Sequence, residues 1–127
     1  MTPLMCLSVA IYFEARGEPI DGQKAVAEVV MNRVEDSRYP DTICGVVFQK
    51  NQFSFTEDGK PDGLPKKPTR ASKRAKKVAQ EVLEGDTIGI TSTHYHTVSV
   101  SPYWKGYFDL DGKIGNHIFY TNNTKYK

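Results

Sequence analysis

The run TPLMCLSVAIYFEARGEP, residues 2–19, decides the fold, because residues 2–13 are almost wholly apolar. On a helix at about 100° per residue, Glu14 lies within about 20° of Leu7. The stripe that carries Leu7 and Ile11 therefore ends in a carboxylate, where a soluble helix carries another aliphatic side chain. Carboxylates are seldom buried unless they are paired or used, so Glu14 is the first candidate for chemistry.

The same run predicts a helix over residues 4–16 that is apolar nearly all round and therefore central in the fold. Gly17 suits the end of this helix, and Pro19 prevents its continuation. A desolvated glutamic acid at such a helix end keeps its proton near neutral pH and can cleave a glycosidic bond. The alternative for Glu14 is a structural role, held by arginine or backbone donors.

Hydrophobic periodicity predicts three further helices, over residues 22–34, 41–48 and 70–84. Residues 50–68 have the composition of a loop, with three prolines and two glycines. The polar residues with expected places on these helices are the N-caps Asp21 and Thr69 and the solvated Glu28 and Arg33.

The composition changes after Gly85, where β-branched and aromatic residues become frequent. Residues 91–100 predict a short strand, residues 111–112 a hairpin-type turn, and residues 117–120 a returning strand. Helices followed by a small antiparallel element indicate a mainly helical α+β fold. The length of 127 residues suits a single domain, residues 1–127.

Composition sets limits on partners. With 39% hydrophobic and 25% charged residues, the chain is an ordinary globular protein, expected to be a monomer. A net charge of +2 gives no reason to expect nucleic acid, and no apolar run is long enough to insert in a bilayer. Between Lys60 and Lys77 there are eight basic residues and one acid, which is either a solvated helix face or an attraction for an anionic polymer.

The N-terminus does not resemble a signal peptide, because no basic residue precedes the apolar stretch and no cleavage site follows it. The two cysteines, Cys6 and Cys44, lack zinc-type neighbours. On spacing alone, two buried thiols and one disulfide are equally good interpretations.

Most glycosidases pair two carboxylates, but no second acid here shares the position of Glu14 on an apolar stripe. This favours a mechanism in which one glutamate protonates the leaving oxygen and then, as a carboxylate, removes a proton from the nucleophile. If the nucleophile is a hydroxyl of the sugar itself, the product is an anhydro sugar. The other candidate carboxylates are Glu18, Glu28, Glu57, Asp109 and Asp111.

Two alternatives use other residues. His94 and His96 would point to one side of a strand, and His117 could complete a three-histidine metal site for a metal-dependent hydrolase. No acid lies beside this triplet to orient it, so no metal and no cofactor are expected. The second alternative is a non-catalytic glycan-binding module built from aromatic side chains, although a binder gains nothing from a buried acid.

Ordered blocks along nearly the whole chain resemble the SleB/CwlJ family of bacterial cell-wall hydrolases. The first block is IYFEARGEP at residues 11–19, continued by the pattern GQ-AVA-V--NRV at residues 22–34. The later blocks are CGVV at 44–47, QFSF at 52–55, THYH at 93–96, P-W at 102–104 and IG-H-FY at 114–120.

The resemblance implies a lysozyme-like fold and a peptidoglycan lytic transglycosylase, in which Glu14 is the catalytic acid. It implies action in the periplasm or cell wall on the bond between N-acetylmuramic acid and N-acetylglucosamine, and it favours the disulfide. Without a leader or binding repeats, the chain is similar to a phage endolysin released through a holin, or to a trimmed catalytic domain. The residues expected along the glycan cleft are Glu18, Gln52, Phe53, Ser54, His94, Tyr95, His96, Trp104, His117 and Tyr120.

Overall fold

The apolar run at the start of the chain forms helix α1, Pro3–Ala15, which contacts each of the other helices. The structure is a computed structural model that describes residues 1–49 and 63–123. Thr2 caps α1 by accepting a hydrogen bond from the backbone N–H of Met5 at 3.1 Å. The predicted central helix is confirmed, and its bounds differ from the expected ones by one residue.

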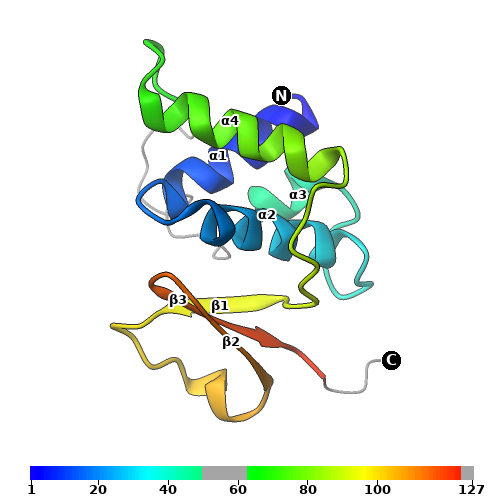
Figure 1. Cartoon of the computed structure of the whole chain (residues 1–127). Helices are drawn as coiled ribbons and strands as arrows, with labels where there is room; N and C mark the ends of the chain where they lie inside the picture. Colours follow the sequence, from blue (N-terminus) through cyan, green and yellow to red (C-terminus); the bar gives the residue numbers. More distant parts are fainter. Residues whose placement is uncertain (50–62, 124–127) are drawn as a thin grey trace.

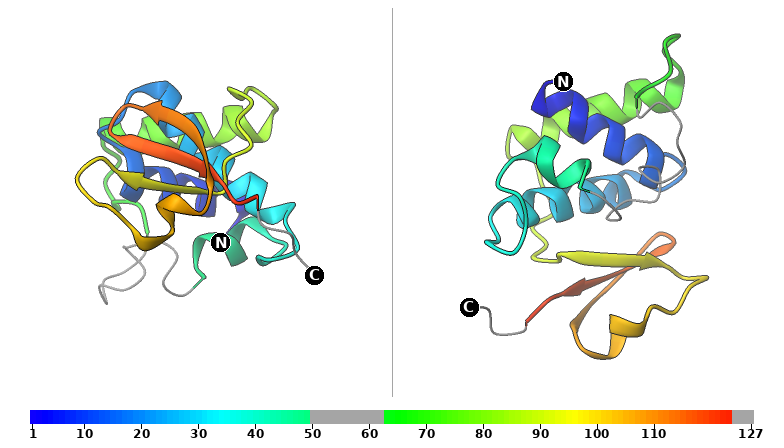
Figure 2. Two further views of the ribbon diagram at one scale, coloured as in Figure 1. Left: turned by 90° about the horizontal axis from the view of Figure 1, so that it is seen from below. Right: turned by 180° about the vertical axis from the view of Figure 1, so that it is seen from behind.

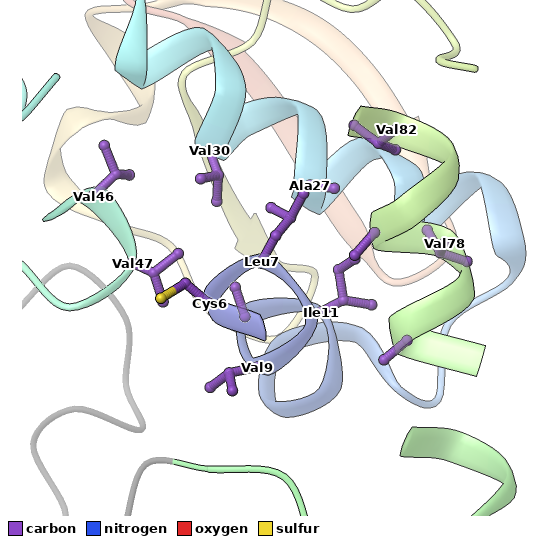
Figure 3. Close-up of a cluster of buried hydrophobic side chains, with 13 residues drawn as sticks. Cys6, Leu7, Val9, Ile11, Ala27, Val30, Val46, Val47, Val78 and Val82 are labelled. Atoms are coloured by element: carbon purple, nitrogen blue, oxygen red, sulfur yellow. The ribbon is translucent and has the colours of Figure 1, made fainter. Parts of the chain in front are cut away.

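In the described part of the chain, three helices surround α1: α2 (Ile20–Val34), α3 (Ile43–Val47) and α4 (Arg70–Leu83). Figure 3 shows side chains from all four helices meeting around α1. Burying an aliphatic side chain contributes about 1.5–3 kcal/mol, so this cluster is the main source of stability for the helical layer. The labelled members are Cys6, Leu7, Val9 and Ile11 of α1, Ala27 and Val30 of α2, Val46 and Val47 of α3, and Val78 and Val82 of α4.

Of the two predicted N-caps, Thr69 is confirmed and Asp21 is wrong. Thr69 caps α4 as predicted, in a reciprocal pair with Ser72 at 3.0 and 2.8 Å. The predicted cap Asp21 is wrong, because α2 begins at Ile20 and Pro19 is its N-cap. Proline fixes a backbone angle that suits a helix start, so α2 begins earlier, and Asp21 lies in its first turn, where a negative charge is favoured.

A disulfide joins Cys6 of α1 to Cys44 of α3 across a sequence separation of 38 residues, with 5.3 Å between the Cα atoms. The structure thus decides between the two interpretations that the spacing left open. The bond links the central helix to the short helix that covers one of its sides. Among the described helices, none has the length and apolar character needed to cross a membrane.

The three strands found among the described residues form one antiparallel sheet in the order β1-β3-β2. The strands are β1 (His94–Thr97), β2 (Asp109–Ile114) and β3 (His117–Thr121), and a 3₁₀ helix, η2 (Tyr103–Gly106), lies between β1 and β2. Figures 1 and 2 show the sheet packed on one side of the helical layer, next to α2. The predicted mainly helical α+β fold with a small antiparallel element is confirmed.

Two details of the sheet differ from the prediction. The first strand is shorter than residues 91–100, and residues 111–112 lie inside β2 instead of forming a turn. Gly112, at a φ of 147°, marks an irregularity in the pairing with β3, and a glycine at a bulge gives the same sequence signal as a turn. The β2–β3 turn is at Gly115, whose φ of 59° is a conformation that glycine adopts readily.

The polar face of α2 is buried, so the predicted solvation of Glu28 and Arg33 is wrong. Glu28 is 3% exposed and accepts hydrogen bonds from the backbone N–H groups of residues 88–90 at 2.9, 2.8 and 3.2 Å. Arg33 is 5% exposed, and its Nε donates to the carbonyl of Thr93 at 2.7 Å. Asn32 donates to two further carbonyls of the same segment at 3.0 and 2.9 Å. These residues hold the irregular segment that leads into β1 against α2.

Candidate active site

The strand register separates the predicted site residues onto two faces of the sheet. Tyr95 lies opposite Phe119, and His117 follows on the same face, because directly paired and alternate residues share a side. Phe119 packs with Ala15 of α1 and Val26 of α2, so this face is turned toward the helices. Four predicted site residues lie on the other side. They are His94, His96 and Tyr120 of the strands, and Trp104 of η2, whose ring lies beside all three.

On the helix-facing side, Tyr95 lies beside the acid that the sequence singled out. Its hydroxyl donates a hydrogen bond to Oε1 of Glu14 at 2.7 Å. Glu14 is in the last turn of α1, as predicted, and its side chain is half-buried. Burial of Tyr95, and then the neighbouring Glu14 carboxylate, raise the pKa of the tyrosine well above its usual value of 10.0. The phenol therefore keeps its proton and remains a donor to Glu14 at neutral pH.

Glu18 lies close to the same group, but its carboxylate is occupied. Oε1 accepts from the backbone N–H of Asn116 at 2.7 Å, and Oε2 accepts from the Asn116 side chain at 3.2 Å. Nδ1 of His117 is 3.7 Å from Glu18 Oε1. A side chain at Gly115 would collide with the Glu18 carboxylate, so glycine is required there by space as well as by backbone conformation. Glu18 therefore ties the α1–α2 connection to the β2–β3 turn.

His117 completes the cluster. It is 5% exposed, and its ring centroid is 4.9 Å from that of Tyr95. Burial lowers the pKa of His117 below 6.5, although the carboxylates of Glu18 and Glu14 oppose that effect. The imidazole is therefore neutral at pH 7. Glu14, Tyr95, His117 and Glu18 form a continuous polar group from the end of α1 to the start of β3.

His96 and Tyr120 are hydrogen-bonded and stacked on the outer face of the sheet, the face turned away from Phe119. His96 Nδ1 is 2.7 Å from the carbonyl of Thr97, so this nitrogen is the one that carries the proton. Nε2 then accepts a hydrogen bond from the Tyr120 hydroxyl at 2.9 Å, and the two rings stack with centroids 5.3 Å apart. Both ring nitrogens of His96 are thus used inside the protein.

His94 lies in an aromatic setting on the same outer face. Its ring is 5.2 Å from Trp104 and 4.6 Å from Phe108, centroid to centroid. Its Nε2 is 3.4 Å from the hydroxyl of Tyr39, and its Nδ1 is 3.0 Å from Oγ1 of Thr93. The predicted residues on this face therefore form a packed aromatic and histidine cluster, separate from Glu14.

The three-histidine metal site does not assemble. His117 lies on the opposite face of the sheet from His94 and His96, because it pairs with Thr97 and not with either of them. Within residues 1–49 and 63–123, no group of three or more histidine, cysteine, aspartate or glutamate side chains could hold a metal ion. His94 and His96 share a face, as predicted, but no local sequence pattern specifies the register of β3.

The half-buried His94 is expected to make the protein less stable in mild acid. Burial, followed by Arg33 and Arg38, lowers the pKa of His94 to about 4 from 6.5, and Asp36 only partly opposes this. Its contribution to stability is complete above pH 6.5 and declines as pH falls toward 4, because only the unfolded chain takes up the proton. Since the ring is partly solvated, we expect a loss of about 2 kcal/mol at most.

Thermal unfolding of the parent protein and of His94→Gln between pH 7.5 and pH 4.5 measures this effect. The fall in Tm with pH is expected to be shallower in the variant. Equal slopes for the two proteins would show that other groups cause the acid sensitivity.

Three predicted cleft residues, Gln52, Phe53 and Ser54, lie outside the described residues. One residue in contact with the polar group of Glu14, Tyr95, His117 and Glu18 was not predicted. It is Asn116, which donates two hydrogen bonds to Glu18. The signal available for it was its place between Gly115 and His117, since asparagine after a turn glycine favours side-chain bonding to nearby chain.

Comparison with known proteins identifies the family. The Cell Wall Hydrolase family model, Hydrolase_2, matches residues 17–120 of this chain. The chain belongs to the cell wall hydrolase family. The matched residues begin just after Glu14 and do not include the candidate acid.

Individual members of the cell wall hydrolase family are similar over a longer stretch. The spore cortex-lytic enzyme of Bacillus cereus is 32% identical over 117 residues, which cover 91% of this chain and 43% of that protein. The spore cortex-lytic enzyme of Bacillus subtilis (strain 168) is 30% identical over 115 residues, covering 89% of this chain and 35% of that protein. The chain thus spans less than half the length of these curated relatives.

Two solved structures of the family share the fold. One is the catalytic domain of the germination-specific lytic transglycosylase SleB from Bacillus anthracis, with a TM-score of 0.78 and 31% identity; the match covers 94% of this chain and 93% of that domain. The other is the catalytic domain of the Bacillus cereus SleB protein, also with a TM-score of 0.78 and 31% identity, covering 94% and 89%. The chain therefore corresponds in extent to a catalytic domain of this family.

Proposed function

We propose that this protein is a peptidoglycan lytic transglycosylase in which Glu14 acts first as general acid and then as general base. The observation that carries the proposal is the 2.7 Å hydrogen bond from the Tyr95 hydroxyl to Oε1 of Glu14. It holds a half-buried carboxyl group in a defined orientation at the end of α1, as a group that must exchange a proton with a substrate requires. Family membership supports a substrate in the bacterial cell wall.

The state of the other acids supports a mechanism with one carboxylate. Glu18 is held by Asn116, and Glu28 by the backbone of residues 88–90. Asp111 accepts from Ser92 and Thr121, both at 2.6 Å, and Asp109 accepts from Asn123 at 2.8 Å. These four carboxylates each link separate parts of the chain, which favours structural roles for them and a mechanism with one catalytic carboxylate. The remaining candidate, Glu57, lies outside the described residues.

In the proposed reaction, Glu14 donates its proton to the glycosidic oxygen that leaves the N-acetylmuramic acid residue. The bond between that oxygen and C1 breaks, and the C6 hydroxyl of the same sugar forms a new bond to C1. Glu14, now a carboxylate, accepts the hydroxyl proton and returns to its starting state. No water is consumed, so the products are a shortened glycan and a 1,6-anhydro end.

The masses of fragments released from purified sacculi test this assignment. Transglycosylation predicts anhydro-muramic ends, each lighter by one water than the reducing end that hydrolysis gives. Release of reducing ends alone would make the protein a hydrolase. Fragments cut only in the peptide stems would remove the glycosidase assignment.

Tyr95→Phe tests the positioning role of the tyrosine. Removal of the hydroxyl frees the Glu14 side chain to rotate, and we expect kcat to fall about tenfold while KM changes little. Tyr103→Phe is the matched control, because Tyr103 is 89% exposed and loses the same atom. An unchanged kcat for a folded Tyr95→Phe protein would show that the hydrogen bond does not position the acid.

The proposed site of action is the cell wall, outside the cytoplasm, with the protein as a monomer and without a cofactor. The disulfide between Cys6 and Cys44 supports an oxidising location, where such bonds persist.

A further inference from the structure

A basic groove lies between α2 and α4, apart from the Glu14 cluster. It has a volume of about 520 Å³. Glu81 is the one carboxylate among its described lining residues, and Ile20 and Val78 give it an apolar part. Its basic lining residues are Lys24, Arg70, Lys73, Arg74 and Lys77.

Four of these five cations lack an acidic partner within the described part of the chain. Lys24 is paired with Asp86 at 3.0 Å, whereas the side chains of the four α4 residues at positions 70, 73, 74 and 77 have no carboxylate at ion-pair distance there. Their spacing of i, i+3, i+4 and i+7 places them on one stripe that runs about 10 Å along the helix. Uncompensated like charges around a concave surface favour a bound anion.

The groove lies at the same end of the helical layer as the candidate acid. Figures 1 and 2 show the C-terminal end of α1, the N-terminal end of α2 and the N-terminal end of α4 together at one end of the layer. Ile20, which lines the groove, follows Glu18 of the Glu14 cluster by two residues. A polymer bound at Glu14 can therefore extend toward the basic stripe.

We propose that this basic groove binds the carboxylates of the peptide stems that branch from a peptidoglycan strand held at Glu14. The inference rests on the proposed function, because it assigns a second contact to the same substrate. Arg70 and Arg74 can hold a carboxylate through two parallel hydrogen bonds, and the lysines add charge.

Two features favour peptide stems over other anionic polymers. The exposed side chain of Ile20 suits the aliphatic parts of a peptide, which polyol phosphate chains lack. The net charge of the whole chain is only +2, so the positive charge is local and does not concentrate the protein on nucleic acid in general.

Co-sedimentation with sacculi freed of teichoic acid tests the inference, with the Glu14→Gln background used to prevent digestion. One preparation keeps its stem carboxylates, and a second has them converted to amides with a carbodiimide and ammonia. The groove variant is Arg74→Ala/Lys77→Ala. The control is Lys76→Ala/Lys113→Ala, which makes the same change in net charge at exposed positions that do not line the groove.

We expect amidation to weaken binding of the background protein and of the control roughly fivefold, since each exposed ion pair contributes modestly. The groove variant is expected to bind both preparations equally weakly. Equal binding of all proteins to both preparations would contradict the inference and show that the basic stripe is only a solvated helix face. A groove effect seen only with a third preparation, which keeps its teichoic acid, would assign the surface to a phosphate polymer instead.

The readouts separate this inference from the proposed function. Failure of the parent protein to release fragments, together with groove-dependent binding to stem carboxylates, would overturn the catalytic proposal alone. Normal cleavage with groove-independent binding would overturn the inference alone.

Discussion

Glu14→Gln is expected to lower the release of soluble fragments from sacculi about 1,000-fold while the protein stays folded. The amide has nearly the same shape and can still accept the hydrogen bond from Tyr95, so the cluster keeps its geometry. It can neither protonate the glycosidic oxygen nor remove the proton of the attacking hydroxyl. Because one group serves both steps in the proposed mechanism, no other acid should restore activity at high or low pH.

Glu35→Gln is the matched control for this experiment, since Glu35 is exposed at the C-terminal end of α2. Its fragment release and Tm should equal those of the parent. Cleavage at the parental rate by a Glu14→Gln protein with an unchanged Tm would remove Glu14 from the mechanism.

Loss of the disulfide is expected to have the largest effect on stability. The bond closes a loop with a sequence separation of 38 residues. The chain-entropy model gives about 4 kcal/mol for a loop of this length. For a domain of this size, we expect Tm to fall by roughly 15 °C. Cys6→Ser/Cys44→Ser compared with the parent by differential scanning calorimetry measures the change.

Reduction of the parent with dithiothreitol provides the control for the cysteine variant, because it breaks the same bond without changing Cβ or the chain. Both proteins should unfold at the same temperature, and the reductant should leave the variant unchanged. A parent whose Tm is insensitive to reductant would show that the bond adds nothing to stability.

The helical part of this fold could be predicted because periodicity and capping are local. The apolar run of α1 and the Thr69 cap of α4 need no knowledge of the rest of the chain. Glu28 and Arg33 were misread for the complementary reason. Their partners are backbone groups of residues 88–93, about sixty positions away, and irregular chain gives no periodic signal of where it packs.

In the candidate site, too, local patterns could be predicted and contacts between distant parts of the chain could not. The position of Glu14 on an apolar stripe identified the acid as a candidate, and alternation along residues 94–96 predicted that the two histidines share a face. Which face turned toward the helices depended on the pairing of β3 with β1, which no local pattern specifies. For that reason the sequence suggested one cleft containing His94, His96 and His117 together, whereas the structure has two clusters on opposite sides of a sheet.

The polar face of α2 is expected to appear in a genetic screen for loss of lytic activity. Glu14 belongs to the helical layer and Tyr95 to the sheet, and the segment leading to Tyr95 is held by Glu28, Asn32 and Arg33. Substitutions at these three positions should therefore be recovered as loss-of-function alleles. Such alleles would group on α2, and they would report the docking of two layers instead of the chemistry.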